Sequence, residues 1–146
     1  MASQTSNTEG NVSKGQRWLN ANYSSIIKSS TGKILDIDNS YGTHSRNAAL
    51  AVWKDVVNRK YGKKLTPSNS NFGTSCISAS PSLTLNSEGT LVYILQFILS
   101  AKGFYTGTMS ARYTTEVKSA VIAYRKSVGL TQDSICDGKT WNKLFN

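Results

Sequence analysis

Residues 110–130 read SARYTTEVKSAVIAYRKSVGL, a run that contains a polar turn, a helical stretch and a helix ending. Thr114 and Thr115 have side chains suited to cap the start of a helix. Gly129-Leu130 places a glycine where helices commonly end in the left-handed conformation, followed by an apolar residue that can fold back onto the last turn. The run therefore predicts an amphipathic α-helix. Its apolar stripe comprises Val117, Ala120, Val121, Tyr124 and Val128.

Four other segments show the same helical spacing of apolar residues. Gly103-Phe104 and Tyr61-Gly62 each follow one of these segments and predict a helix end of the same kind as Gly129-Leu130. Asp137 is suited to cap the start of the last segment. The sequence therefore predicts an all-α protein. The four segments are residues 18–27, 49–61, 91–98 and 141–145.

A short polar turn around an aromatic or apolar residue occurs four times, and a helical segment follows each copy closely. The copies are DNSYGTHS at 38–45, NSNFGTSC at 69–76, SARYTTEV at 110–117 and DSICDGKT at 133–140. Between the second and third copies lies SASPSLTLNSEGT, residues 78–90, which reads as a polar connector. Two turns therefore fall in each half of the chain.

This pattern predicts two tandem modules of three short helices each, with their turns gathered on one side. We place the modules at residues 15–82 and 83–146. Residues 1–14, MASQTSNTEGNVSK, are small and polar without periodicity, so we expect a flexible linker there.

The chain is basic, with 17 Lys and Arg against 8 Asp and Glu, and residues 1–82 hold ten of the basic and four of the acidic side chains. The densest cluster is RKYGKK, Arg59 to Lys64, of which one or two charges are explained by the favourable effect of cations at a helix end. The excess favours attraction to polyanions such as nucleic acid, anionic lipid or a phosphate-bearing wall polymer. An evenly solvated basic surface is the alternative.

No apolar run approaches the roughly 20 residues of a membrane span. The amino-terminal residues lack the basic-then-apolar pattern of a signal peptide. The sequence therefore predicts a soluble protein that the general secretion route does not export.

The residue types that catalysis or metal binding would need are few. His44 is the single histidine, and Cys76 and Cys136 are too few and too far apart for a metal site. We expect buried or half-buried free thiols, with a disulfide between the two cysteines as the alternative. Asp36 and Asp38 could be paired carboxylates, although capping a turn is the ordinary role of aspartate there. We therefore expect no catalysis, no metal and no cofactor.

The second half resembles the bacterial peptidoglycan-binding domain of type 1, a small three-helix module. The resemblance is carried by LQFILSAKGFYTG, SARYTTEVKSAVIAYRKSVGL and DSICDGKTWNKL, and it covers residues 90–146. The first half is similar to a divergent copy, through GQRWLNANY, DNSYGTHSRNAALAVWKDVVNRKYGKKL and NSNFGTSC. The tandem arrangement is similar to the carboxy-terminal wall-binding part of phage endolysins and autolysins. The resemblance implies peptidoglycan as the ligand.

The chain departs from the family at the turns, where the family has glycine after an aspartate. Asn39 stands there in the first turn, and asparagine tolerates a positive φ. In the third turn Ala111 stands there, after Ser110 in place of the aspartate. The sequence therefore predicts an altered geometry for that turn.

The ligand site is expected at the polar turns, because glycans and muramyl peptides need hydrogen-bonding groups, a flat aromatic ring and a cation. An alternative interpretation is that the rings of Tyr41 and Tyr113 fill the ends of the helical bundles and that His44 is a solvated residue at a helix start. The three tryptophans, Trp18, Trp53 and Trp141, lie on apolar stripes and are expected in the core. The candidate binding residues are Asp38, Asn39, Tyr41, His44, Arg46, Arg112, Tyr113 and Asp133.

The sequence thus predicts a non-catalytic protein that binds bacterial peptidoglycan, and anionic wall polymers through its basic charge. Its partner would be the catalytic domain of a lytic enzyme such as a phage endolysin, which it targets to the wall. It would act at the cell wall, after residence in the host cytoplasm if it is phage-encoded. The alternative is a small basic nucleic-acid-binding protein, which would need Lys and Arg along one exposed helix face. Because the basic cluster is confined to one helix end and the aromatic residues lie mostly on core stripes, nucleic acid is not the expected partner. A membrane is not expected either, because no apolar run is long enough to span one.

Overall fold

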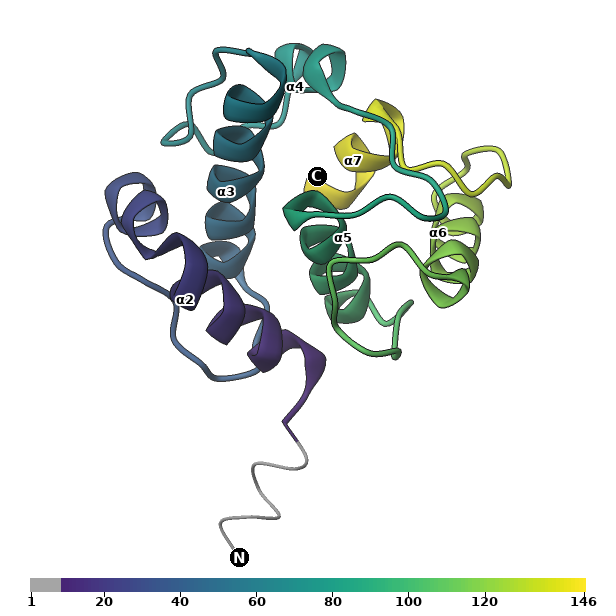
Figure 1. The fold of residues 1–146 in the computed structure, drawn as a ribbon, viewed down its shortest axis with the longest axis horizontal. Helices are drawn as coiled ribbons and strands as arrows, with labels where there is room; N and C mark the ends of the chain where they lie inside the picture. Colours follow the sequence, from purple (N-terminus) through teal and green to yellow (C-terminus); the bar gives the residue numbers. More distant parts are fainter. Residues whose placement is uncertain (1–8) are drawn as a thin grey trace, which may run out of the picture.

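The computed structural model describes residues 9–146, which form six α-helices and no strand (Figure 1). The prediction of an all-α protein is confirmed. The first half of the chain supplies α2, α3 and α4, and the second half supplies α5, α6 and α7. The helices are α2 (Asn11–Thr31), α3 (Thr43–Tyr61), α4 (Thr74–Ala79), α5 (Thr90–Ala101), α6 (Thr115–Ser127) and α7 (Gly138–Phe145).

Local sequence signals explain where several of these helices begin and end. Thr114 caps α6 and Asp137 caps α7, and each side chain accepts a hydrogen bond from the backbone N–H three residues on. After α5 the N–H of Phe104 donates to the carbonyl of Leu99 at 2.8 Å, which is the fold-back expected of a Schellman ending. The predicted caps of α6 and α7 and the predicted ending of α5 are confirmed.

The amino-terminal boundary of the first helix was predicted wrongly. We expected a flexible linker up to residue 14, but α2 begins at Asn11 and Ser13 is buried. The amide Nδ2 of Asn11 donates to Ser100 Oγ at 3.2 Å and to the carbonyl of Gly107 at 3.0 Å, so contacts far along the chain hold this first turn. Polar side chains bonded to distant partners leave no apolar periodicity to detect. The expectation for residues 1–8 lies outside the described residues.

A kink divides α2 into two parts. Tyr23 has φ −137° and ψ 28°, outside the helical region, so the helix changes direction there (Figure 1). The hydroxyl of Tyr23 shares a hydrogen bond with Thr90 Oγ1 at the start of α5, and Asn22 donates to the carbonyl of Trp18 at 2.9 Å. Beyond the kink the helix continues to Thr31.

One hydrophobic core runs through both halves of the chain. Trp18 of α2 stacks on Tyr93 of α5 with ring centroids 3.9 Å apart. At Gly15 a Cβ atom would lie 2.1 Å from Phe97 Cδ1, so only glycine allows α2 to approach α5 this closely. Fully buried Trp53 and Trp141, one from each half, meet edge to face with centroids 5.8 Å apart. The two halves therefore pack as one body.

The short helices α4 and α7 also join the halves. A Cβ at Gly138, the first residue of α7, would lie 2.6 Å from the carbonyl oxygen of Ile77 in α4. Phe145 stacks on Phe72 with centroids 5.3 Å apart. The amide Nδ2 of Asn146 donates to the carbonyl of Phe72 at 3.2 Å. The last residues of the chain thus pack against the first half.

The polar connector at 78–90 pairs with the second half through two isolated antiparallel bridges. Leu83 and Cys136 exchange both backbone hydrogen bonds at 2.9 Å, and Glu88 bridges to Arg112. Cys76 and Cys136 are both buried free thiols, so the alternative of a disulfide is not realised. Burial raises the pKa of the Cys136 thiol well above its ordinary value.

Candidate functional site

A buried glutamine braces the first polar turn. Gln16 of α2 accepts hydrogen bonds at Oε1 from the N–H groups of Asp38 and Asn39, at 3.1 and 3.0 Å. Its Nε2 donates to Asp38 Oδ1 at 3.0 Å, to the carbonyl of Ser40 at 3.1 Å and to Ser45 Oγ at 3.2 Å. Because this one side chain satisfies several groups of the turn, it fixes residues 38–45 against α2.

The same device holds the third polar turn. Gln96 of α5 is fully buried, accepts the N–H of Ser110 at 2.7 Å and donates to the carbonyl of Arg112 at 2.9 Å. Ser110 Oγ in turn accepts the N–H of Arg112 at 3.3 Å, as the Asp38 carboxylate does for Ser40 at 3.0 Å. Serine therefore replaces the aspartate in its bonding role.

The turn residue that follows differs between the halves. Asn39 has a positive φ of 59°, whereas Ala111 is not among the residues of positive φ in the described part of the chain. The predicted difference in turn geometry is therefore confirmed. An L-residue with a Cβ avoids the left-handed region that asparagine tolerates.

Buried basic residues hold the second and fourth polar turns. The Lys54 ammonium donates to the carbonyls of Asn69 at 2.5 Å and Asn71 at 2.9 Å, and burial lowers its pKa. The Arg125 guanidinium is buried and donates to the carbonyl of Thr131 at 2.9 Å. Both cations are occupied within the protein, so neither is offered to a ligand.

Both candidate tyrosines pack inside the protein. Tyr113 is buried and its hydroxyl donates to the carbonyl of Ser134. The Tyr41 ring packs edge to face on Phe97 of α5 with centroids 5.4 Å apart, and its hydroxyl is buried without a partner among the described residues. Burial raises the pKa of both hydroxyls. The buried ring of Tyr113 presents no face on which a sugar could stack, and the half-buried ring of Tyr41 packs against Phe97, in agreement with the alternative that the rings plug the bundle ends.

Two further candidate residues are occupied by contacts within the fold. Arg46 donates from Nε to the carbonyl of Phe145 at 2.8 Å and from Nη1 to the carbonyl of Ser70 at 2.6 Å. Asp133 lies 3.2 Å from Arg125 and accepts the N–H of Ile135 at 3.0 Å. Arg46 joins the two halves, and Asp133 shapes its own turn.

Three candidates remain near or at the surface. Asp38 is exposed, and the N–H of Ser40 followed by the amide of Gln16 lowers the pKa of its carboxyl group. Asn39 is exposed and uses Oδ1 to accept the N–H of Ser13 at 2.9 Å. Arg112 is exposed beside Glu88 at 3.5 Å, a separation and exposure that give a weak ion pair.

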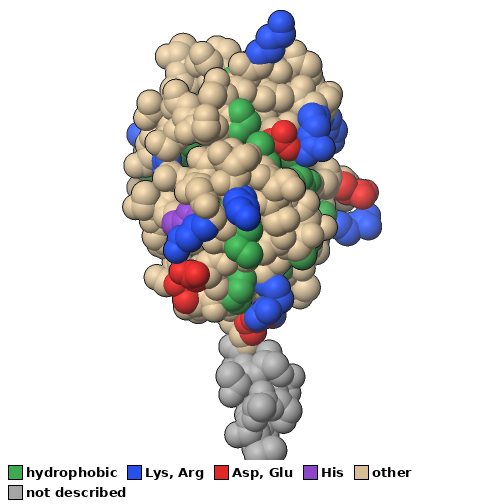
Figure 2. Space-filling model, turned by 90° about the vertical axis from the view of Figure 1, so that its left-hand side faces the viewer, with side chains coloured by type: hydrophobic (Ala, Val, Ile, Leu, Met, Phe, Trp, Pro, Cys, Tyr) green, Lys and Arg blue, Asp and Glu red, His purple; other side chains and the backbone are tan. Residues whose placement is uncertain are grey.

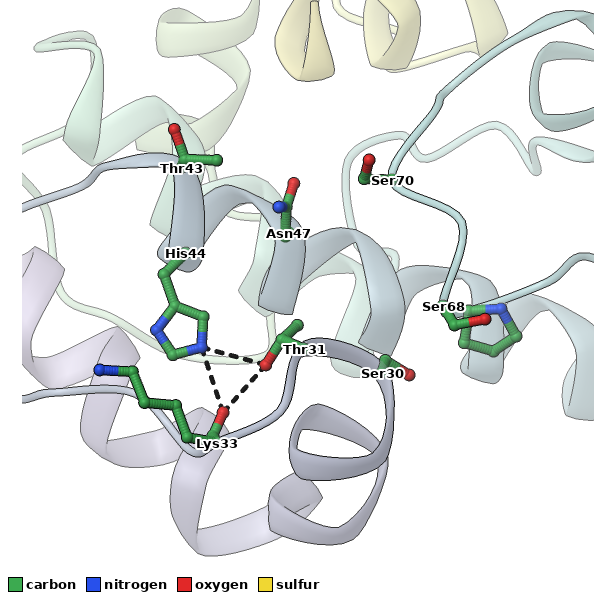
Figure 3. Close-up of a pocket in the computed structure, with 9 residues that line it drawn as sticks. Ser30, Thr31, Lys33, Thr43, His44, Asn47, Ser68 and Ser70 are labelled. Atoms are coloured by element: carbon green, nitrogen blue, oxygen red, sulfur yellow. Dashed lines mark hydrogen bonds between the residues drawn. The ribbon is translucent and has the colours of Figure 1, made fainter.

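His44 lies at the boundary of two depressions on the face formed by α2 and α3. Figure 2 shows this face, where the single histidine lies beside a basic side chain, with acidic side chains below. The smaller depression has a volume of about 240 Å³ and includes Asp36 and Asp38. The larger has a volume of about 490 Å³. Its lining residues are Ser30, Thr31, Lys33, Thr43, His44, Asn47, Pro67, Ser68 and Ser70 (Figure 3).

The imidazole of His44 is held in one orientation. Its Nε2 lies 3.1 Å from the carbonyl of Lys33 and 3.0 Å from Thr31 Oγ1 (Figure 3). Because a carbonyl oxygen can only accept, we assign the proton of the neutral ring to Nε2, which leaves the lone pair on Nδ1. The neutral ring therefore offers an acceptor at Nδ1.

Sequence reasoning placed His44 at the candidate site but missed most of the residues around it. Ser30, Thr31 and Lys33 come from the end of α2 and the loop after it, and Ser68 and Ser70 come from the loop before α4. The candidate binding residues were chosen within individual polar turns, whereas the pocket is lined by residues from three separate segments of the chain. Ser70 lies in the repeated polar turn at 69–76, whereas no local motif in the sequence marks Ser30 or Ser68.

Within residues 9–146, no group of three or more His, Cys, Asp or Glu side chains is arranged to hold a metal ion. In the same part of the chain, every helix is too short or too polar to cross a membrane.

The fold and the polar surface define a compact helical module that offers hydrogen-bonding groups and cations to a ligand. Residues 88–144 match the family described as "Putative peptidoglycan binding domain". The match supports binding to the bacterial cell wall. It spans α5, α6 and α7, so the His44 surface lies outside the matched residues. Comparison with curated proteins and with solved structures found no match.

Proposed function

We propose that this protein is a non-catalytic binding protein that attaches to bacterial peptidoglycan and brings a lytic enzyme to the wall. The family match over residues 88–144 carries the proposal. The net charge of +9 supports attraction to the anionic polymers of the wall, with a strength that falls as salt screens the field.

We further propose that the first half is a divergent copy of the same module. The argument is the shared bracing of a polar turn by a buried glutamine, Gln16 in α2 and Gln96 in α5. A buried cation that ties down the next turn, Lys54 in one half and Arg125 in the other, repeats the pattern. Two copies in one body give two surfaces for one polymer, which raises the affinity for a long chain over that for a fragment.

The proposed partner is a catalytic domain that cuts the wall, as in phage endolysins and autolysins. In that role the protein acts at the cell wall, after residence in the host cytoplasm if a phage encodes it. Its own part is attachment, so that the catalytic domain stays near its substrate at a high local concentration.

A sedimentation assay tests the proposal. The purified chain is incubated at physiological salt with peptidoglycan sacculi stripped of teichoic acid, with unstripped walls, and with immobilised duplex DNA. We expect the chain to sediment with both wall samples and to remain in solution with DNA. Retention on DNA without retention on walls would instead support the nucleic-acid alternative. Wall turbidity is followed in parallel, and clearing by this chain alone would contradict a non-catalytic role.

A further inference from the structure

The larger pocket beside His44 exists because α2 is longer than its counterpart α5. α5 ends at Ala101, soon after its bracing residue Gln96, whereas α2 continues to Thr31. The kink at Tyr23 follows Gln16 at the same separation as the helix-ending Gly103 follows Gln96. Residues 24–31 are therefore an added helical segment of the first half, and its last two residues form one wall of the pocket.

The opposite wall is fixed by Arg46. Its Nη1 donates to Asn47 Oδ1 at 2.8 Å and to the carbonyl of Ser70 at 2.6 Å. Its Nε is anchored on the carbonyl of Phe145 at 2.8 Å, in the second half of the molecule. Arg46 thus acts as a positioning residue that holds two pocket residues, and it leaves the Nδ2 donors of Asn47 for a ligand.

The residues that line the pocket are of polar types except Pro67, and none of them, among the described residues, is acidic. The hydroxyls of Ser30, Ser68, Ser70 and Thr43 can donate and accept hydrogen bonds. Among the described residues, the Lys33 ammonium has one ionic neighbour, Asp36 at 3.7 Å, and both side chains are largely exposed. Such an ion pair is weak, so the ammonium can exchange Asp36 for a ligand anion at little cost.

We propose that this pocket binds a hydroxyl-rich ligand that carries an anionic group, either a sugar acid or a polyol phosphate. Hydroxyls of the ligand pair with the serines and with Asn47, and its anion pairs with Lys33. Among the described lining residues there is no Phe, Tyr or Trp, and the imidazole of His44 is held by Thr31 and Lys33, so the selection comes from hydrogen bonds and charge rather than from stacking on a sugar face. The inference rests on the proposed function, because both ligand types occur as parts of the bacterial wall.

Nuclear magnetic resonance titration of the full chain tests the inference. The probes are N-acetylmuramic acid, which carries a carboxylate, glycerol 3-phosphate, which carries a phosphate, and neutral N-acetylglucosamine as the matched control. We expect saturable shifts of the Ser30, Lys33, His44 and Asn47 signals with one or both anionic probes. Shifts with N-acetylmuramic acid alone would show that the pocket binds a sugar acid. Shifts with glycerol 3-phosphate alone would show that it binds a polyol phosphate.

Two variants of equal net charge show whether Lys33 makes the contact. Lys33→Gln removes the ammonium of a lining residue, whose side chain extends past His44 on the side away from the serines (Figure 3), whereas Lys28→Gln removes an exposed ammonium of α2 that does not line the pocket. Losing a charge-assisted hydrogen bond should weaken binding of the anionic probe roughly tenfold in Lys33→Gln and leave it unchanged in Lys28→Gln. Equal weakening in both variants would mean that binding depends on the net charge of the protein and not on a contact with Lys33, and it would overturn the inference.

The outcomes separate this inference from the proposed function. If the chain sediments with walls but no anionic probe shifts the pocket signals more than N-acetylglucosamine does, the pocket inference fails and wall binding stands. If an anionic probe binds the pocket while the chain stays in solution beside walls, the pocket is confirmed as an anion site and the proposed function fails.

Discussion

Two buried glutamines hold the backbone of the first and third polar turns in place by hydrogen bonds. An exposed turn residue can change without consequence for the fold, but Gln16 accepts from the N–H groups of Asp38 and Asn39, which have no other partner among the described residues. Where water does not reach such groups, leaving them unpaired costs about 1–3 kcal/mol. Gln96 does the same for Ser110 in the second half. Each glutamine therefore links the start of a module to its first turn.

The replacement Gln16→Leu should raise the pKa of Asp38 toward its ordinary value of about 3.9. The N–H of Ser40 and the Gln16 amide lower that pKa in the native protein, and the variant loses the amide. A carboxyl group whose pKa is lowered on folding stabilises the fold above its unfolded-state pKa, and this stabilisation is lost as the pH falls through the folded pKa. The variant should lose less stability on acidification.

The measurement is a titration of the Asp38 carboxyl carbon by nuclear magnetic resonance, with acid unfolding followed in parallel. Gln96→Leu is the matched control, because it removes the corresponding brace from the other half and should leave the pKa of Asp38 unchanged. An identical titration of Asp38 in native protein and Gln16→Leu would show that the Ser40 N–H alone sets its pKa.

At the scale of helices, the close contact of α2 and α5 depends on one glycine. Gly15→Ala places a methyl group 2.1 Å from the Phe97 ring, so the helices must separate. Overpacking of this kind typically costs 1–3 kcal/mol, which exceeds the gain of about 1 kcal/mol from better helix propensity. We expect a lower midpoint of urea unfolding. Ser24→Ala, an exposed change in the same helix, should be neutral or slightly stabilising.

A second substitution tests whether the Phe97 ring causes the loss of stability in Gly15→Ala. Combining Gly15→Ala with Phe97→Leu removes part of the ring, so the double variant should be more stable than the sum of the two single changes predicts. Additive costs would place the cause elsewhere in α2.

The helices were predictable because their signals are local. The stripe at 117–128 with its threonine cap, and the glycine ending after α5, each need only a few neighbouring residues. The stripe at 18–27 predicted helix in the first part of the added segment at 24–31. The start of α2 at Asn11 was not predicted, since it depends on bonds to Ser100 and Gly107, and neither was the kink at Tyr23.

The candidate site was predictable only in part, for the same reason. The polar turn pointed to His44 and to exposed Asp38, whose surroundings come from nearby residues. The aromatic Tyr41 was selected for its chemistry, but its ring lies against Phe97 from the other half of the chain. Pocket residues such as Ser70 reach the site through loops whose course a local pattern does not describe.

The whole molecule unfolds as one unit if the shared core is its main support. Phe145 of the last helix is 2% exposed and packs on Phe72 of the first half. Phe145→Ala should lower the free energy of unfolding by about 3–5 kcal/mol, because a large buried ring is lost. Far-ultraviolet circular dichroism and tryptophan fluorescence should report one coincident transition in both proteins.

Phe104→Ala serves as the control, since Phe104 is half-buried and packs on Tyr124 within the second half. Its cost should be clearly smaller than that of Phe145→Ala. Two separate transitions in the native protein would mean that the halves fold independently, and the proposed fixed relation between their surfaces would then not hold.

The burial of both thiols has a practical consequence for labelling. Cys76 is 4% exposed and Cys136 is fully buried, so a maleimide dye has no accessible native cysteine to attack in the folded protein. A cysteine introduced at an exposed site such as Lys28 would therefore be the one reactive handle. A single fluorophore could be attached there without altering either native thiol, and the protein could be followed on bacterial surfaces under the microscope.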